Sequence, residues 1–213
     1  MEQKNIAAQI VEAIKNEDCE AIFNLFKENP EQAKTFTPFG GQTWLGYAAQ
    51  IGKLDSLKAL VEVGIDINLG DKRENRPPIC SAAANDHLDV VEYLLRSGAE
   101  LDVSTSVSNA LFSAIVGRSP SIVKLLLEAG IDSEVRYNSE TMRNMDAVAF
   151  ALMRGEKEIA QTIALWNVNK DEEAANVLFY STNQKLTWKI FCLILGIRSI
   201  ATRNPPDVCM RNH

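Results

Sequence analysis

Apolar residues in this chain recur at helical spacing, in short blocks that end in glycine. Within residues 54–61, three leucines and a valine fall on one face of a helix. This block is followed by Gly64, and closely similar blocks are followed by Gly98 and Gly130. A glycine after an amphipathic helix is typical of a left-handed turn that ends the helix. The pattern predicts a series of short helices separated by tight turns.

The three closing glycines are spaced by 34 and 32 residues. A period of about 33 residues indicates stacked structural repeats. A single helix pair of this length cannot bury its apolar face alone, so each repeat is stabilised by its neighbours. This organisation favours a binding surface over a catalytic centre.

The most specific motif is the sequence GQTWLGYAAQIG at residues 41–52. It resembles the ankyrin-repeat phrase G-x-T-P-L-H-x-A-A-x-x-G, with Trp44 in place of proline and Gly46 in place of histidine. We expect Thr43 to cap a helix through its hydroxyl and Gly52 to permit the left-handed turn that ends it. The resemblance implies an all-α ankyrin-repeat solenoid of about five or six helix pairs with short β-turn fingers. The fingers and first helices would line a concave groove.

Three further units follow the same rhythm. The second spans 76–98 and has two prolines that suit a first helical turn. Asp86 stands in this unit at the position of the turn glycine, and aspartate tolerates the left-handed conformation better than most residues. The third unit spans 109–130, and the fourth spans 146–167 after a longer loop at 136–143.

Weaker matches flank these units. Residues 1–35 are expected to form a degenerate N-terminal capping repeat, and residues 36–168 to form four ankyrin repeats. Residues 169–201 are expected to form C-terminal capping helices, because terminal repeats must present one polar face to water. Residues 202–213 contain two prolines among polar neighbours and are predicted to be a flexible tail.

Composition narrows the class of protein. The 213 residues are 46% apolar, which is typical of a soluble globular protein with a sizeable core. The net charge of −6 argues against binding to nucleic acid and allows a protein partner with a basic surface. Scattered cysteines and a charged, amphipathic N-terminus favour the cytoplasm. The longest apolar run, 190–197, is shorter than the roughly 20 residues of a spanning helix, so no membrane partner is expected.

The sequence contains no assembled catalytic or metal site. The only histidines are His87 and His213, and no CxxC pair supports a zinc site. Ser81, His87 and Asp89 could be written as a triad, but none lies on a strand-to-helix elbow. No Gly-Lys-Ser/Thr phosphate loop is present. We therefore expect no catalytic residue, no cofactor, no metal and no enzymatic activity.

The candidate protein-binding residues lie on the fingers and first helices, at positions predicted to project away from helix packing. They are Phe39, Gln42, Gln50, Arg73, Arg76, Asn85, Thr105, Ser108, Tyr137, Arg143 and Arg154. Arg76, Tyr137 and Arg143 are expected to contribute most, since arginine and tyrosine are enriched among hot spots. Alternatively, the loop arginines are only solvated surface charge.

Two aromatic residues need separate consideration. Trp44 is as consistent with packing against the N-terminal cap as with a role as a binding anchor. Tyr137, in the long loop, has no implied core position and is the better anchor candidate.

The resemblance implies a protein-binding function. The phrase MRNMDAVAFA at 142–151 is similar to small bacterial ankyrin proteins, some of which are immunity proteins that neutralise a cognate toxin. We expect a cytoplasmic inhibitor or immunity protein that occupies the surface of a toxin or enzyme. A general adaptor that joins two proteins and an enzyme with a cryptic site are the alternatives. An adaptor would need a second domain or linear motif, which only the C-terminal segment could supply.

Overall fold

A computed structural model describes residues 6–38, 40–138 and 143–168, together with 171, 175–176 and 180–183. The described part contains ten α-helices, one 3₁₀ helix and no strand longer than an isolated bridge. The predicted all-α solenoid is confirmed. In chain order the helices are α1 (Ile6–Asn16), α2 (Cys19–Glu28), η1 (Pro30–Lys34), α3 (Trp44–Gln50), α4 (Leu54–Glu62), α5 (Pro78–Ala84), α6 (Leu88–Arg96), α7 (Ala110–Val116), α8 (Pro120–Glu128), α9 (Ala147–Met153) and α10 (Lys157–Asn167).

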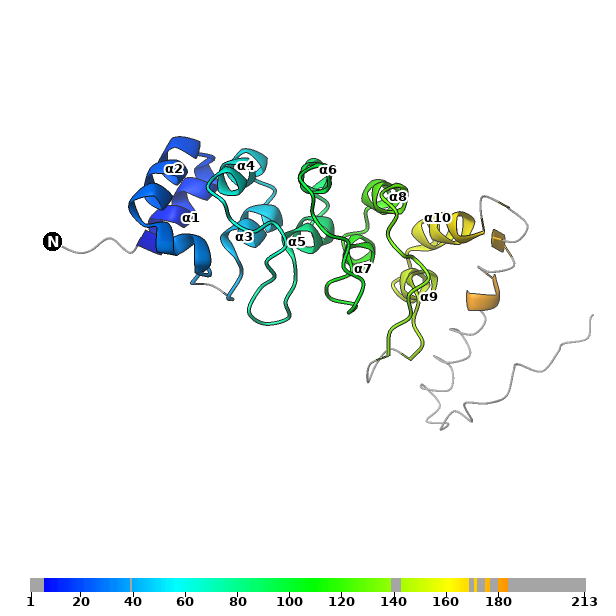
Figure 1. The fold of residues 1–213 in the computed structure, drawn as a ribbon. Helices are drawn as coiled ribbons and strands as arrows, with labels where there is room; N and C mark the ends of the chain where they lie inside the picture. The colour runs from blue at the N-terminus through cyan, green and yellow to red at the C-terminus, as the bar shows by residue number, and fades with distance from the viewer. Residues whose placement is uncertain are drawn as a thin grey trace, which may run out of the picture.

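The helices form five antiparallel pairs that stack in chain order (Figure 1). The inner helices α3, α5, α7 and α9 pack side by side, and so do the outer helices α4, α6, α8 and α10. Figure 1 shows the loops before the four inner helices projecting beyond the row that those helices form. Each of the last four helix pairs therefore presents one loop and one inner helix on the same side of the stack.

Side-chain caps start most of the inner helices. The Thr43 hydroxyl accepts a hydrogen bond from the Gly46 amide at 2.9 Å, as the sequence predicts. Asn109 caps α7 and Asp146 caps α9 in the same way. At α5 the cap position is occupied by Pro77, which has no side-chain hydrogen bond to offer, and the fixed backbone of the following proline begins the helix. Local sequence thus sets where each inner helix begins.

Left-handed residues form the turn inside each helix pair. Gly52 has a φ of +69°, and Asp86 occupies the equivalent turn with a φ of +60°. Both predictions for these positions are confirmed. Arg118 adopts the same conformation with a φ of +57° and pairs with Glu156 of the next repeat at 3.0 Å. An arginine is rare in this backbone region, and the sequence gives no signal for it.

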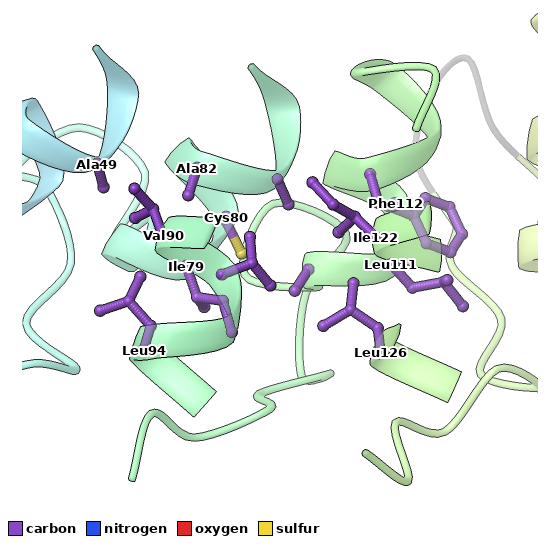
Figure 2. Packing of buried hydrophobic residues seen from close by; sticks show 14 of the residues in the cluster. Ala49, Ile79, Cys80, Ala82, Val90, Leu94, Leu111, Phe112, Ile122 and Leu126 are labelled. Atoms are coloured by element: carbon purple, nitrogen blue, oxygen red, sulfur yellow. The ribbon is translucent and has the colours of Figure 1, made fainter. Parts of the chain in front are cut away.

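The core runs continuously between the two layers of helices (Figure 2). Leu94 on α6 and Leu126 on α8 are fully buried, as expected for second helices that pack between neighbours. Alanines such as Ala49 and Ala82 are also fully buried and allow the inner helices to approach one another closely. The apolar contact between repeats is the main source of stability in a stack of this kind.

Trp44 packs against the N-terminal cap. Its indole is 1% exposed, and its Nε1 donates a hydrogen bond to the Gln32 carbonyl at 2.9 Å. The ring lies edge-on to Phe26 of α2, with the centroids 6.4 Å apart. Of the two sequence interpretations, packing is therefore correct, and Trp44 is not available as a binding anchor.

The C-terminal predictions are only partly covered by the structure. The capping helices expected at 169–201 and the tail expected at 202–213 fall largely outside the described residues. Across the described chain, every helix is too short or too polar to cross a membrane.

Candidate functional site

Four loops that precede the inner helices present most of the candidate binding residues. We call them fingers 1 to 4, at residues 36–43, 69–76, 101–109 and 136–146. Together with the exposed sides of α3, α5, α7 and α9 they form the surface that we call the finger face. Fingers 1 and 4 each contain one antiparallel bridge, Phe36 to Thr43 and Tyr137 to Met145.

Backbone hydrogen bonds fix the shape of finger 2. The Asp71 amide donates to the Arg76 carbonyl at 3.1 Å, which closes the finger at its base. The Asp71 carboxylate accepts from the backbone amides of Arg73 and Glu74 at 3.0 and 2.8 Å. The Lys72 amide donates to the Gly41 carbonyl at 3.0 Å and joins finger 2 to finger 1. The charged side chains at the tip of finger 2 are therefore carried on an ordered backbone.

A cleft of about 320 Å³ lies between fingers 1 and 2 and the helices α3 and α5. Its walls are polar, and five of the eleven predicted binding residues contribute to them. The lining residues are Gly40, Gln42, Gln50, Asp71, Arg73, Glu74, Arg76, Ser81 and Asn85. Residues from two successive repeats thus meet in one site.

Side-chain hydrogen bonds orient the amides of the cleft. The Gln42 Nε2 donates to the Gln50 Oε1 at 2.7 Å, and the Asn85 Nδ2 donates to the Ser81 carbonyl at 2.8 Å. These bonds leave the Gln50 amide nitrogen and the Asn85 oxygen available to a ligand. The cleft can therefore both donate and accept hydrogen bonds.

Two arginines provide the positive charge of the cleft. The Arg76 guanidinium pairs with Glu74 at 2.9 Å, and both side chains are substantially exposed. Within the described residues, no carboxylate lies within ion-pair distance of Arg73. A ligand anion could therefore approach Arg73 directly.

The other half of the finger face contains two exposed apolar side chains. Val116 and Met153 are the last residues of α7 and α9, and each is 42% exposed. The equivalent last residues of α3 and α5 are Gln50 and Ala84. The last residue of the inner helices therefore changes from polar in α3 to apolar in α7 and α9.

Arg154 directly follows Met153 at the end of α9. Its guanidinium carbon is 5.9 Å from the centroid of the Phe150 ring, which gives a weak cation–π contact. Arg154 is exposed, as are Thr105 on finger 3 and Arg143 on finger 4. The remaining candidate, Phe39, lies outside the described residues.

Tyr137 is a core residue, which corrects the sequence interpretation. It is 9% exposed, and its ring packs edge-on against Phe112 with the centroids 5.0 Å apart. Its hydroxyl donates to the Val103 carbonyl at 2.8 Å and accepts from the Asn109 Nδ2 at 2.9 Å. These two hydrogen bonds join Tyr137 of finger 4 to finger 3. Tyr137 cannot act as an exposed anchor.

Ser108 is buried as well, at 4% exposure. The prediction that it projects away from the packed positions is therefore wrong. Its hydroxyl lies 2.8 Å from that of Thr105, and its carbonyl accepts a hydrogen bond from the Cys80 thiol at 3.0 Å. Burial raises the pKa of Cys80 to about 12. A thiol with such a pKa stays protonated and unreactive, which agrees with a structural role.

Sequence reasoning missed Val116 and Met153. Both end apolar runs, ALFSAIV and AVAFALM, and apolar side chains at the end of such a run are ordinarily assigned to the core. Alignment of the four inner helices would have revealed them, because Gln50 occupies the same final position in α3. A polar residue at an equivalent position indicates that packing does not require an apolar one.

Two of the residues considered for a catalytic triad, His87 and Ser81, have structural surroundings. The His87 Nε2 lies 3.0 Å from the Gln50 carbonyl and links two repeats. Ser81 is buried at 7% exposure. No group of three potential metal ligands is found among the residues that the structure describes.

Several curated proteins are similar in sequence to part of this chain, and the names of some of them include ankyrin repeats. The chain is 46% identical over 63 residues to alpha-latrocrustotoxin-Lt1a of Latrodectus tredecimguttatus, covering 29% of this chain and 4% of that protein. It is 35% identical over 107 residues to ankyrin repeat domain-containing protein SAT10 of Stachybotrys chartarum, covering 49% of this chain and 5% of that protein. It is 32% identical over 99 residues to the B-cell lymphoma 3 protein homolog of Mus musculus, covering 46% of this chain and 22% of that protein.

The chain thus spans only a small part of the length of these relatives. A family model described as ankyrin repeats (3 copies) matches residues 10–105 and 45–138, which together make up more than half of the chain. The match includes the first three inner helices and fingers 1 to 3. The protein belongs to the ankyrin repeat family.

Proposed function

We propose that this protein is a cytoplasmic inhibitor or immunity protein that occupies the surface of a toxin or enzyme through its finger face. Ankyrin repeats bind other proteins, so the chain is a protein–protein interaction module. Members of the family are typically not enzymes. The partner would be blocked by coverage of its surface, without chemistry on the part of this chain.

The observation that carries the proposal is the polar cleft between fingers 1 and 2. Its side chains come from two repeats, and those of Arg73, Gln50 and Asn85 are exposed. Exposed side chains in an ordered site add little to folding, whereas hydrogen bonds and ion pairs to a partner would use them. The net charge of −6 favours long-range attraction to a partner whose overall surface is basic.

The finger face can be tested with the full chain as bait. A triple variant, Gln50→Ala with Arg73→Ala and Arg76→Ala, removes cleft side chains and no buried apolar group. The control, Lys124→Ala, changes an exposed residue on the outer helix α8. Tyr137 is left unchanged because its replacement would disturb the fold.

Affinity capture from the source cell, read by mass spectrometry, should return a protein with the wild-type chain and with Lys124→Ala but not with the triple variant. The captured protein is then assayed with and without this chain, and loss of its activity supports inhibition. Retention of its activity would favour a general adaptor. Capture that survives the triple variant and fails with Lys124→Ala would place binding on the outer helices.

A further inference from the structure

The finger face contains a charge arrangement that selects a type of ligand. In the cleft, the Asp71 carboxylate is held by two backbone amides of its own finger. The other carboxylate that lines the cleft, Glu74, pairs with the Arg76 guanidinium. This ion pair is exposed. Exposed ion pairs contribute little and exchange partners easily. Two guanidinium groups, Arg73 and Arg76, are therefore available to a ligand carboxylate.

This local charge is opposite to that of the whole chain. The net charge of −6 includes acidic residues on the outer helices, such as Glu92 on α6 and Glu128 on α8. Long-range attraction follows the net charge, whereas contact energy depends on the groups within a few ångströms. A partner with a basic surface overall can therefore still insert an acidic side chain here.

The apolar end of the finger face lies two repeats away. Helix α3 packs on α5, α5 on α7 and α7 on α9. Neighbouring helix axes are about 10 Å apart, so the distance from the α3–α5 cleft to Val116 and Met153 is about 20 Å. An extended polypeptide rises about 3.3 Å per residue and spans this distance with about six residues.

We propose that the segment of the partner that binds the finger face is an extended peptide with two anchors. One anchor is an aspartate or glutamate that binds Arg73 and Arg76 in the cleft. The other is a large apolar side chain, about six residues away, that covers Val116 and Met153. This inference rests on the proposed function, because it assumes that the finger face binds a protein.

The test uses random twelve-residue peptides displayed on phage and selected on the full chain. The selected pool is expected to be enriched in pairs of one acidic and one large apolar residue spaced by five to seven positions. A synthetic peptide from the pool should bind at least ten-fold more weakly to the Arg73→Gln, Arg76→Gln variant. Binding to the Val116→Ser, Met153→Ser variant should weaken to a similar degree.

Glu74 provides the sharpest readout because its charge competes with a ligand carboxylate. The Glu74→Gln variant should bind the selected acidic peptide several-fold more tightly, and its affinity should fall more steeply with added salt, because the cleft then has one more net positive charge. A basic ligand would give the opposite sign, since Glu74 would then be one of its partners. Glu92→Gln on the outer helix α6 is the matched control and should leave the affinity unchanged.

The outcomes separate the two proposals. Peptides that need Gln50 and Val116 but are enriched in lysine or arginine would overturn the acidic anchor and leave the finger face as the binding site. Acidic peptides without the apolar residue would overturn the two-anchor arrangement. A pool that binds all finger-face variants as well as the wild-type chain would overturn this inference. The proposed function would then still stand if the Gln50→Ala, Arg73→Ala, Arg76→Ala variant fails to capture the partner in the bait experiment.

Discussion

The hydroxyl of Tyr137 joins finger 4 to finger 3, and its removal tests how finger 4 is held. In Tyr137→Phe the ring remains in contact with Phe112, but the Asn109 Nδ2 loses its acceptor and the Val103 carbonyl loses its donor. Asn109 is 1% exposed, so water reaches its amide poorly. A buried donor left without a partner costs about 1–3 kcal/mol. We expect the free energy of unfolding to fall by that amount.

The measurement is urea denaturation followed by circular dichroism. Tyr93→Phe on α6 is the control, because its hydroxyl makes no hydrogen bond among the described residues. This variant should change the free energy of unfolding by less than about 0.5 kcal/mol, as is usual for surface substitutions. If Tyr137→Phe is as harmless as Tyr93→Phe, the hydroxyl does not hold the fingers together and the argument fails.

Alkaline pH gives an independent readout of the same hydroxyl. Burial raises the pKa of Tyr137 above its ordinary value of 10.0. Because the folded-state pKa is the higher one, this contribution to stability is fully present below pH 10 and is lost as the pH rises through the folded pKa. The wild-type protein should therefore lose more stability above pH 10 than Tyr137→Phe does. Parallel losses in the two proteins would contradict the burial of the hydroxyl.

Three further predictions concern the stack. Leu94→Ala should lower the free energy of unfolding by about 2–5 kcal/mol, because this side chain is fully buried between helices; a loss below about 0.5 kcal/mol in chemical denaturation would place it at the surface. Gly52→Ala should destabilise more than Gly98→Ala: both glycines have positive φ, but only at Gly52 would a Cβ collide with the His87 ring, and equal melting temperatures would refute this. Far-ultraviolet circular dichroism should show mainly helix, and a spectrum dominated by strand would contradict the fold.

The sequence predicts the repeat architecture because the architecture depends on local and periodic signals. Thr43 caps α3, Gly52 and Asp86 form left-handed turns, and Leu94 recurs at a packed position. Each of these roles is set by residues close in the chain or one repeat away. Periodicity repeats the same signal, so an error at one position does not change the whole assignment.

The finger residues could be predicted only in part. Gln42 and Arg73 belong to different repeats and meet in one cleft because fingers 1 and 2 are joined by a backbone hydrogen bond. The sequence places Tyr137 in an exposed loop because a loop of this length has no periodic pattern that marks a buried position. Its burial depends on Asn109 and Val103, which are about one repeat away in sequence and come close only after the repeats stack. Side-chain contacts of this kind have no local signature.

The last residue of each inner helix shows how one fold can carry different binding chemistry. Gln50, Ala84, Val116 and Met153 occupy this position in α3, α5, α7 and α9. An apolar side chain left 42% exposed gains only part of the stabilisation that full burial of its area would give, about 25 cal/mol per Å². Folding therefore places little demand on this position, and residues of any polarity fit it. In the two-anchor arrangement that we propose, the change from glutamine to methionine along the stack would match a partner segment that is itself polar at one end and apolar at the other.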